Sequence, residues 1–174
     1  MRFKDYPEFT PNVTPERMFR SGAFGGTYWR PIHSKVVGKD LQNQHKKYSF
    51  LKGIPADKMT RPFDEYDKDI NKYKVKVGTT LQYWESKGWI HKSQPYGWVQ
   101  WYCDFYNGKR NKEEDEYQIK RWLNTAGPNS RFRKALVNEI KRKGGKYNDA
   151  SISPKKRQTL LHWGVELVPS DMKS

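Results

Sequence analysis

A helical period of apolar residues is clearest in the middle of the chain. Four aromatic residues recur there at positions i, i+3, i+4 and i+7: Trp98, Trp101, Tyr102 and Phe105. Positions with this spacing share one face of an α-helix, whereas a strand would place alternate residues on one face. We therefore predict a helix over about residues 96–106, with an aromatic face.

Five further helices are predicted from the same period and from capping residues at their ends. They lie between Thr14 and Gly22, between Thr79 and Gly88, from about Glu113 to the break at Gly127, over about residues 131–142, and between Ser153 and Gly164. In the helix over residues 131–142 the period turns Phe132, Leu136 and Ile140 inward. Four basic residues of this helix are expected to be exposed: Arg133, Lys134, Lys141 and Arg142.

The fold expected from these elements is mainly α. We predict a single compact helical domain over residues 14–168. An extended N-terminal arm, residues 1–13, contains two prolines. Residues 169–174 are expected to form a frayed tail.

Glycine and proline interrupt the segment at about 34–76, which is expected to be irregular and loop-rich. Short helices near Tyr48–Leu51 and Asp64–Tyr73 are expected within it. The alternation of apolar and polar residues over 73–77 is too short to establish a strand. Before this segment, the run Phe24-Gly25-Gly26-Thr27 predicts a packing turn. Its glycines would also allow close approach to a phosphate, but the spacing of a P-loop is missing.

The composition indicates a core built from a few large side chains. Hydrophobic residues make up only 34% of the 174 residues, yet aromatic residues make up 15%. A buried ring removes about 150–250 Å² from water. Low aliphatic content with high charge is also typical of disorder, but the seven tryptophans argue against it.

The charge is strongly positive and unevenly distributed. The chain carries a formal net charge of +15, and residues 131–157 hold ten basic residues against Glu139 and Asp149, a net charge of +8 within 27 residues. A basic cluster favours a polyanionic partner, either nucleic acid or an acidic membrane surface. A surface that only keeps the protein in solution, or a basic component of a virion or particle, would give the same total.

The function expected from this charge is binding of nucleic acid, DNA ahead of RNA, mainly through the two final helices. The cationic side chains expected to contact phosphates are Lys109, Arg110, Arg131, Arg133, Lys134, Lys141, Arg142, Lys143, Lys146, Lys155, Lys156 and Arg157. The aromatic residues that could stack on bases are Tyr28, Trp29, Trp98, Tyr102 and Tyr147. With so few aliphatic residues, packing in the core is the expected role of most of these rings.

An enzyme acting on nucleic acid, by removing or modifying a base, is the alternative. Asp104 lies on the aromatic helix near Arg110, and Asp115 and Arg121 follow on the next helix. A carboxylate among rings and guanidinium groups could act as a general base. It could equally form an ion pair that holds two helices together, and this reading is favoured.

No metal or cofactor is expected. The four histidines lack the spacing of a metal site, and His162, between Leu161 and Trp163, has the environment of a structural histidine. Cys103 is the only cysteine, which excludes an intramolecular disulfide and a cysteine-based zinc site.

Four phrases of the sequence carry a resemblance. They are Phe24-Gly25-Gly26-Thr27-Tyr28, Tyr83-Trp84-Glu85-Ser86-Lys87-Gly88-Trp89, Gly97-Trp98-Val99-Gln100-Trp101-Tyr102 and Gln158-Thr159-Leu160-Leu161-His162-Trp163-Gly164. Over roughly residues 14–168 the chain resembles a group of small basic, Trp-rich hypothetical proteins of fungi, algae and large DNA viruses. The resemblance implies an intracellular protein linked to DNA, and brings no activity and no catalytic residue with it.

Location follows from the lack of targeting signals. The chain has no run of eighteen apolar residues and no signal-peptide core near Met1. We therefore expect no membrane partner and an intracellular site of action: the nucleus, a cytoplasmic virus factory or a virion.

Overall fold

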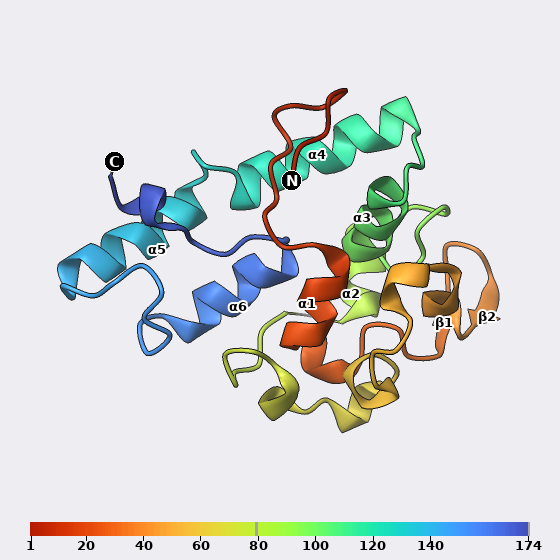
Figure 1. Cartoon of the computed structure of the whole chain (residues 1–174). Helices are drawn as coiled ribbons and strands as arrows, with labels where there is room; N and C mark the ends of the chain where they lie inside the picture. Colours follow the sequence, from red (N-terminus) through yellow and green to blue (C-terminus); the bar gives the residue numbers. More distant parts are fainter. Residues whose placement is uncertain (79, 174) are drawn as a thin grey trace.

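The computed structural model describes residues 1–78 and 80–173 and shows a mainly helical fold with one small sheet (Figure 1). The helices are α1 (Pro15–Ser21), α2 (Leu81–Ser86), α3 (Trp98–Tyr106), α4 (Lys112–Ala126), α5 (Arg131–Arg142) and α6 (Pro154–His162). The strands are β1 (Ile32–Ser34) and β2 (Lys39–Leu41). The prediction of a mainly α fold is confirmed, although the hairpin means that the chain is not all-helical.

Three helix starts carry the capping hydrogen bond that the sequence predicts, whereas Ser153 at the start of α6 donates to Glu139 and does not cap its helix. The side chain of Thr14 accepts a hydrogen bond from the backbone N–H of Arg17 at the start of α1, and Ser130 accepts one from Arg133 at the start of α5. Such caps satisfy backbone donors that have no partner within the helix. Helix α2 is capped by Thr80, while Thr79 lies outside the described residues.

Helix α2 ends as its glycine predicts. The N–H of Gly88 donates to the carbonyl of Glu85, and the N–H of Trp89 donates to the carbonyl of Trp84, both at 3.1 Å. This pair of bonds is the Schellman arrangement, in which the residue after the helix has a positive φ, here +71° at Gly88. It turns the indole of Trp89 back towards the helix, where it contacts Tyr83 edge-to-face.

The segment at 34–76 is irregular, as predicted, but its details differ. Strands β1 and β2 pair antiparallel, with Ile32 opposite Leu41, and this hairpin was not predicted. The helix expected over Asp64–Tyr73 is wrong: two 3₁₀ turns, Phe63–Glu65 and Lys68–Ile70, occupy that stretch. A third 3₁₀ turn, Ser49–Leu51, lies where a short helix was expected, and residues 73–77 form no strand.

Asn71 explains why this stretch does not continue as a helix. Its buried side chain accepts a hydrogen bond from the N–H of Gly25 at 2.7 Å and donates to the carbonyl of Val75 and the hydroxyl of Tyr66. These three hydrogen bonds fix the backbone around Asn71 in a non-helical conformation. They also use the N–H that a phosphate would need at Gly25, where an added Cβ would lie 2.5 Å from the ring of Tyr66. The glycine run is therefore a packing turn, as predicted.

The largest fully buried side chains of the core are aromatic rings, and the N-terminal arm supplies one of them. Residues 1–13 contain no helix or strand, yet Phe9 is fully buried. Its ring makes edge or tilted contacts with five core rings: Trp98, Trp101, Tyr102, Phe105 and Trp122. The arm is thus an extended segment that the core requires.

The same arm is fastened to the far end of the chain. The backbone N–H groups of Asn12 and Val13 both donate to the carbonyl of Gly164, at 2.9 and 3.0 Å. The side chain of Asn12 also forms a reciprocal pair of hydrogen bonds with the backbone of Glu166. Residues 9–13 and 164–166 therefore close the fold together.

The last residues correct two predictions. Pro169–Lys173 forms a 3₁₀ helix against α5 instead of a frayed tail, and Ser174 lies outside the described residues. Asp171 in this helix pairs with Arg133 at 2.9 Å, and Arg133 also donates to the carbonyl of Ala126. Arg133 was expected to be exposed, but it is 8% exposed.

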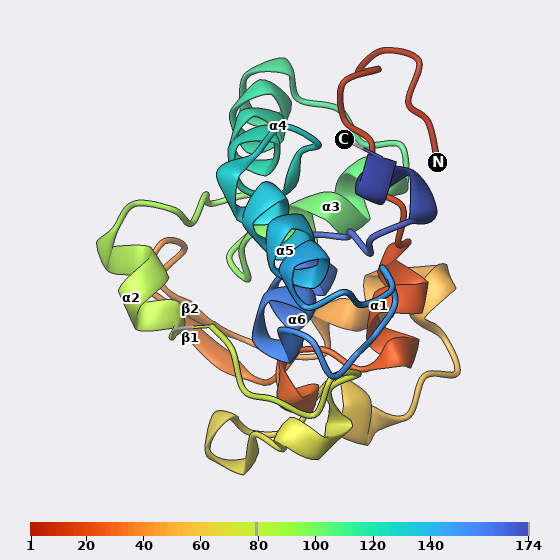
Figure 2. The same cartoon turned by 90° about the vertical axis from the view of Figure 1, so that its left-hand side faces the viewer.

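The helices lie around the core on different sides. Figure 1 shows α4 and α5 following each other along one side, with α6 beside α5 and the β1–β2 hairpin at the opposite side. Figure 2 shows α2 at the edge of the molecule beside the hairpin, where the N–H of Lys35 donates to Glu85 at 2.9 Å. Among the described residues, no helix combines the length and apolar composition needed to cross a lipid bilayer.

Candidate ligand pocket and basic surface

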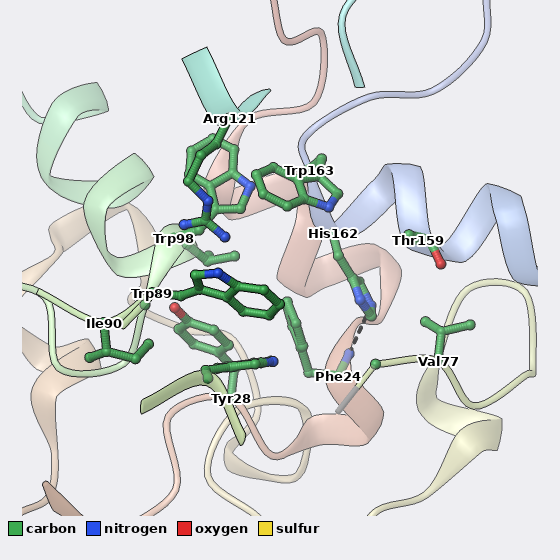
Figure 3. A pocket seen from close by; sticks show the side chains of 14 residues that line it. Phe24, Tyr28, Val77, Trp89, Ile90, Trp98, Arg121, Thr159, His162 and Trp163 are labelled. Carbon is green, nitrogen blue, oxygen red and sulfur yellow. Dashed lines mark hydrogen bonds between the residues drawn. The ribbon is translucent and has the colours of Figure 1, made fainter. Parts of the chain in front are cut away.

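An aromatic pocket of about 210 Å³ opens between elements that are far apart in the sequence (Figure 3). It is lined by Phe24 and Tyr28 of the glycine turn, Val77 and Gly78, Trp84 of α2, Trp89 and Ile90, Gly97, Trp98 and Val99 at the start of α3, Arg121 of α4, and Thr159, His162 and Trp163 of α6 and its end. We call this cavity the aromatic pocket. Its wall is apolar except for a few polar groups.

One wall combines indole rings with a guanidinium group. The rings of Trp98 and Trp163 lie 5.2 Å apart at 31° to each other. The guanidinium of Arg121 lies over Trp163 at 5.5 Å and over Trp89 at 5.8 Å, and Figure 3 shows these side chains gathered together. Burial lowers the pKa of Arg121, but a guanidinium remains charged in proteins. A cation is thus held among ring faces, where the ring quadrupoles favour it.

The opposite wall contains a buried, neutral histidine that stacks on Phe24. The rings of Phe24 and His162 stack with centroids 3.8 Å apart. The backbone N–H of Phe24 donates to His162 Nε2 at 3.1 Å, and the side-chain amide of Gln158 donates to the same nitrogen at 3.0 Å. The orientation of that amide is set by its other two bonds, to the N–H of Tyr73 and the carbonyl of Gly22.

Two donors on Nε2 mean that the proton of neutral His162 sits on Nδ1. Burial lowers the pKa of His162 to about 3, so the ring is neutral at physiological pH. Phe24 has a φ of +58°, an uncommon conformation for a bulky residue that needs support from its surroundings. Its hydrogen bond and ring stacking with His162 supply that support. His162 thus has the structural role that the sequence indicated, with Nε2 accepting two hydrogen bonds.

The polar groups of the pocket suit binding better than acid–base catalysis. Among its described lining residues, none carries a carboxylate, and Arg121 is the one that bears a charge. The hydroxyl of Thr159 already donates to the carbonyl of Lys155 at 2.9 Å. A neutral histidine whose pKa lies near 3 is a poor base at neutral pH.

The residues predicted for an enzyme site do not meet in one cavity. Asp104 accepts hydrogen bonds from Tyr48 at 2.7 Å and Gln94 at 3.1 Å and does not line the aromatic pocket. The burial of Tyr48, and then its bond to Asp104, raise the pKa of that phenol. Asp104 thus joins α3 to the segments that contain Tyr48 and Gln94 instead of facing a reaction site.

The other candidates separate in the same way. Asp115 is buried and accepts hydrogen bonds from the indole of Trp101 and the backbone of Asn111, each at 2.9 Å. Arg110 pairs with Asp5 at 2.7 Å and lies over the ring of Phe105 at 3.6 Å. Of the four predicted residues, Arg121 alone reaches the aromatic pocket.

Most of the predicted stacking residues are core residues. Trp29 and Tyr102 are fully buried, and Tyr147 is half-buried. Tyr28 and Trp98 are also buried, at 3% and 8% exposed, but both contribute to the wall of the aromatic pocket. Core packing is therefore the main role of these rings, as expected.

The basic residues divide into an exposed group and an inward group. Exposed cations follow α5, the next loop and the start of α6: Arg131, Lys134, Lys141, Arg142, Lys143, Lys146 and Lys155. We call this group the α5–α6 basic surface. Within α5, Arg131, Lys134, Lys141 and Arg142 fall on one face by the helical period.

The inward group corrects the prediction for several residues. Arg157 is buried and donates to the carbonyls of Ile152 and Tyr147 at 2.8 and 2.7 Å, and Arg133 is buried against Asp171 as described. Lys156 is half-buried and pairs with Glu139 at 3.0 Å.

Glu139 is the main acidic group beside this surface. Hydrogen bonds from Ser153 and Lys156 lower the pKa of Glu139 to about 2. It also pairs with Lys143 at 3.6 Å.

Lys109 is exposed and lies just before the start of α4, whereas α5 follows the end of α4 (Figure 1). Lys109 and Arg110 therefore stand apart from the α5–α6 basic surface.

Comparison of the chain with protein-family models, curated proteins and solved structures gave no match. The aromatic pocket itself was missed from the sequence, including the roles of Trp89, His162 and Trp163. A signal was present, because each of the four phrases rich in glycine and aromatic residues, around positions 24–28, 83–89, 97–102 and 158–164, supplies part of its wall.

Proposed function

We propose that the protein binds nucleic acid through the α5–α6 basic surface. The observation that supports this proposal is the row of exposed cations along one face of α5, continued by Lys146 and Lys155. Cations spaced along a helix face can each contact a phosphate and release a condensed counterion. In this proposal DNA is the preferred partner, since the resembling proteins occur in large DNA viruses and in fungi and algae, and the site of action is a nucleus, a virus factory or a virion.

The proposal makes a quantitative statement about salt. If all seven cations contact phosphates of duplex DNA, the logarithm of the binding constant falls against the logarithm of salt concentration with a slope of about −6. This follows from roughly 0.9 released counterions per contact. Fluorescence anisotropy with a labelled duplex between 50 and 200 mM salt measures that slope.

A charge-matched pair of triple variants tests the location. The surface variant replaces Arg131, Lys134 and Arg142 by glutamine and should lower the magnitude of the slope by about 3. The control variant replaces three lysines on the opposite side of the molecule by glutamine: Lys46, Lys47 and Lys52. Both variants lose the same net charge, so a difference between them reports position.

Three outcomes can be distinguished. A larger loss of affinity in the surface variant supports the proposal. An equal loss in both triple variants means that total charge alone matters, as in a basic particle component, and a flat salt dependence of the unmodified protein removes phosphate binding altogether.

A further inference from the structure

The size of the aromatic pocket limits its ligand. Its volume of about 210 Å³ lies below the range of roughly 300–1,000 Å³ that is usual for pockets of drug-sized ligands. One ring system fits such a space, with any attached sugar and phosphate left outside. The indoles of Trp98 and Trp163 contact each other at 5.2 Å and form one aromatic wall, against which a planar ring can stack.

The charge of the pocket excludes a cationic ligand. A guanidinium already lies over the faces of Trp89 and Trp163, and no carboxylate among the described lining residues could offset a second positive charge. The ligand must instead offer hydrogen-bond acceptors. Arg121 has donors to spare, since the one hydrogen bond assigned to its five N–H groups within the described residues runs from Nη1 to Gln118 at 2.9 Å.

Planarity and an edge with two acceptors together specify a nucleobase. Guanine presents O6 and N7 side by side, the pair that an arginine contacts in a bidentate manner. Adenine presents a donor in place of O6, which would oppose the guanidinium. Base–aromatic stacking would hold either ring, but the arginine distinguishes them.

We propose that the aromatic pocket binds a single nucleobase, stacked against the indoles of Trp98 and Trp163, with Arg121 contacting the acceptor edge and guanine preferred. This inference does not depend on the proposed function, because a free nucleotide would suffice. A base turned out of a strand would present the same ring. Thr159 of the pocket lies one helical turn after Lys155 of the α5–α6 basic surface, about 5–6 Å along α6.

The first experiment uses calorimetric titration of the full chain with nucleoside monophosphates. GMP should bind at least about tenfold more tightly than AMP, the discrimination typical of a bidentate arginine contact. Ribose 5-phosphate, which lacks the base, should show no measurable binding. Equal binding of GMP and ribose 5-phosphate would show that the phosphate alone is recognised and would overturn the inference.

Variants of the pocket separate stacking from edge recognition. Arg121→Met keeps an unbranched side chain and should abolish the preference for GMP over AMP. Trp163→Leu should lower the binding affinity for both nucleotides. Arg142→Met, on the basic surface, removes the same charge as Arg121→Met and should leave the GMP-to-AMP ratio unchanged. If Arg121→Met fails to fold, Arg121→Lys retains the charge without the planar fork and should also lose the preference. A GMP-to-AMP ratio that stays unchanged in the Arg121 variant contradicts the inference.

A final experiment distinguishes a base of a free nucleotide from a base turned out of a strand. It also keeps this inference separate from the proposed function. The surface variant that lacks Arg131, Lys134 and Arg142 should bind GMP as the unmodified protein does, whether or not it binds DNA. If it loses GMP binding, the nucleotide sits on the basic surface and the pocket assignment is wrong. An oligothymidine carrying one guanine should bind more tightly than one carrying adenine at that position if the pocket takes its base from a strand; equal binding assigns the pocket to free nucleotides.

Discussion

Replacing His162 should change how the stability of the protein depends on pH. His162 accepts two hydrogen bonds at Nε2 and has a pKa of about 3 in the folded protein, against about 6.5 in an unfolded chain. Below pH 6.5 the unfolded chain therefore binds a proton that the folded protein does not. Because the folded pKa is the lower one, stability falls as pH falls, and the loss is complete only near pH 3.

The size of this effect follows from the two pKa values. Each pH unit below 6.5 costs about 1.4 kcal/mol until the folded ring itself titrates. Between pH 7.5 and 4.5 the loss due to His162 is thus about 3 kcal/mol. At pH 4.5 the folded ring is still neutral, since its pKa lies lower.

His162→Gln isolates this contribution. Glutamine offers an acceptor for the N–H of Phe24 but cannot be protonated in this range. Urea unfolding followed by tryptophan fluorescence at pH 7.5 and 4.5 gives the free energy of unfolding of both proteins. The unmodified protein should lose about 3 kcal/mol more than the variant over this interval, while the carboxylates shared by both proteins cancel. Equal losses would refute the assignment of a buried neutral ring, and so would an NMR titration that places the pKa of His162 near 6.5.

Two further substitutions test the packing of the chain ends by the same unfolding measurement. Phe9→Ala removes a fully buried ring and should cost about 3–5 kcal/mol, whereas Glu8→Ala on the exposed part of the same arm should stay within about 0.5 kcal/mol; similar values for both would mean that the arm is not part of the core. Asp171→Asn leaves the guanidinium of Arg133 buried without its counter-charge and should cost about 3 kcal/mol, with exposed Lys173→Ala as the control; an unchanged midpoint for Asp171→Asn would show that the terminal 3₁₀ helix does not dock.

Helix positions were predictable because the signals that set them are local. The hydroxyl that caps α5 belongs to Ser130, three residues before the N–H that it binds, and the glycine that ends α2 stands two residues beyond the helix. The three-residue strands of the hairpin carry no such signal. Their pairing joins Ile32 to Leu41 across a turn, and two such short segments are too brief for an alternating pattern to be recognised.

The helical period indicated that Arg133 is buried, but its charge led to the opposite prediction. Arg133 precedes Val137 by four residues and Ile140 by seven, so the helical period places it on the buried stripe. Its charge favoured exposure in the sequence interpretation. The counter-charge that permits burial, Asp171, lies 38 residues away, where no local rule could connect the two.

The four phrases that line the aromatic pocket could be recognised in the sequence, but their assembly into one cavity could not, for a related reason. Seven tryptophans indicated a core that contains rings, and four of them are buried in it: Trp29, Trp98, Trp101 and Trp122. A cavity, however, is the space that rings from separate segments leave unfilled. Whether Trp89 and Trp163 meet or stand apart depends on how α2, α4 and α6 pack, which the period of each helix does not specify. Arg121 was singled out for its charge, and the structure gives it different neighbours from those expected.

The closure between residues 9–13 and 164–166 has a consequence for biosynthesis. Synthesis runs from the N-terminus, so residues 9–13 emerge from the ribosome before Gly164, which follows them by about 150 residues. Until that glycine emerges, the backbone N–H groups of Asn12 and Val13 lack the carbonyl that accepts their hydrogen bonds. At roughly 5–20 residues per second, this interval lasts some 8–30 s. During synthesis the N-terminal segment therefore remains without its C-terminal anchor, and it stays accessible to chaperones until Gly164 has emerged.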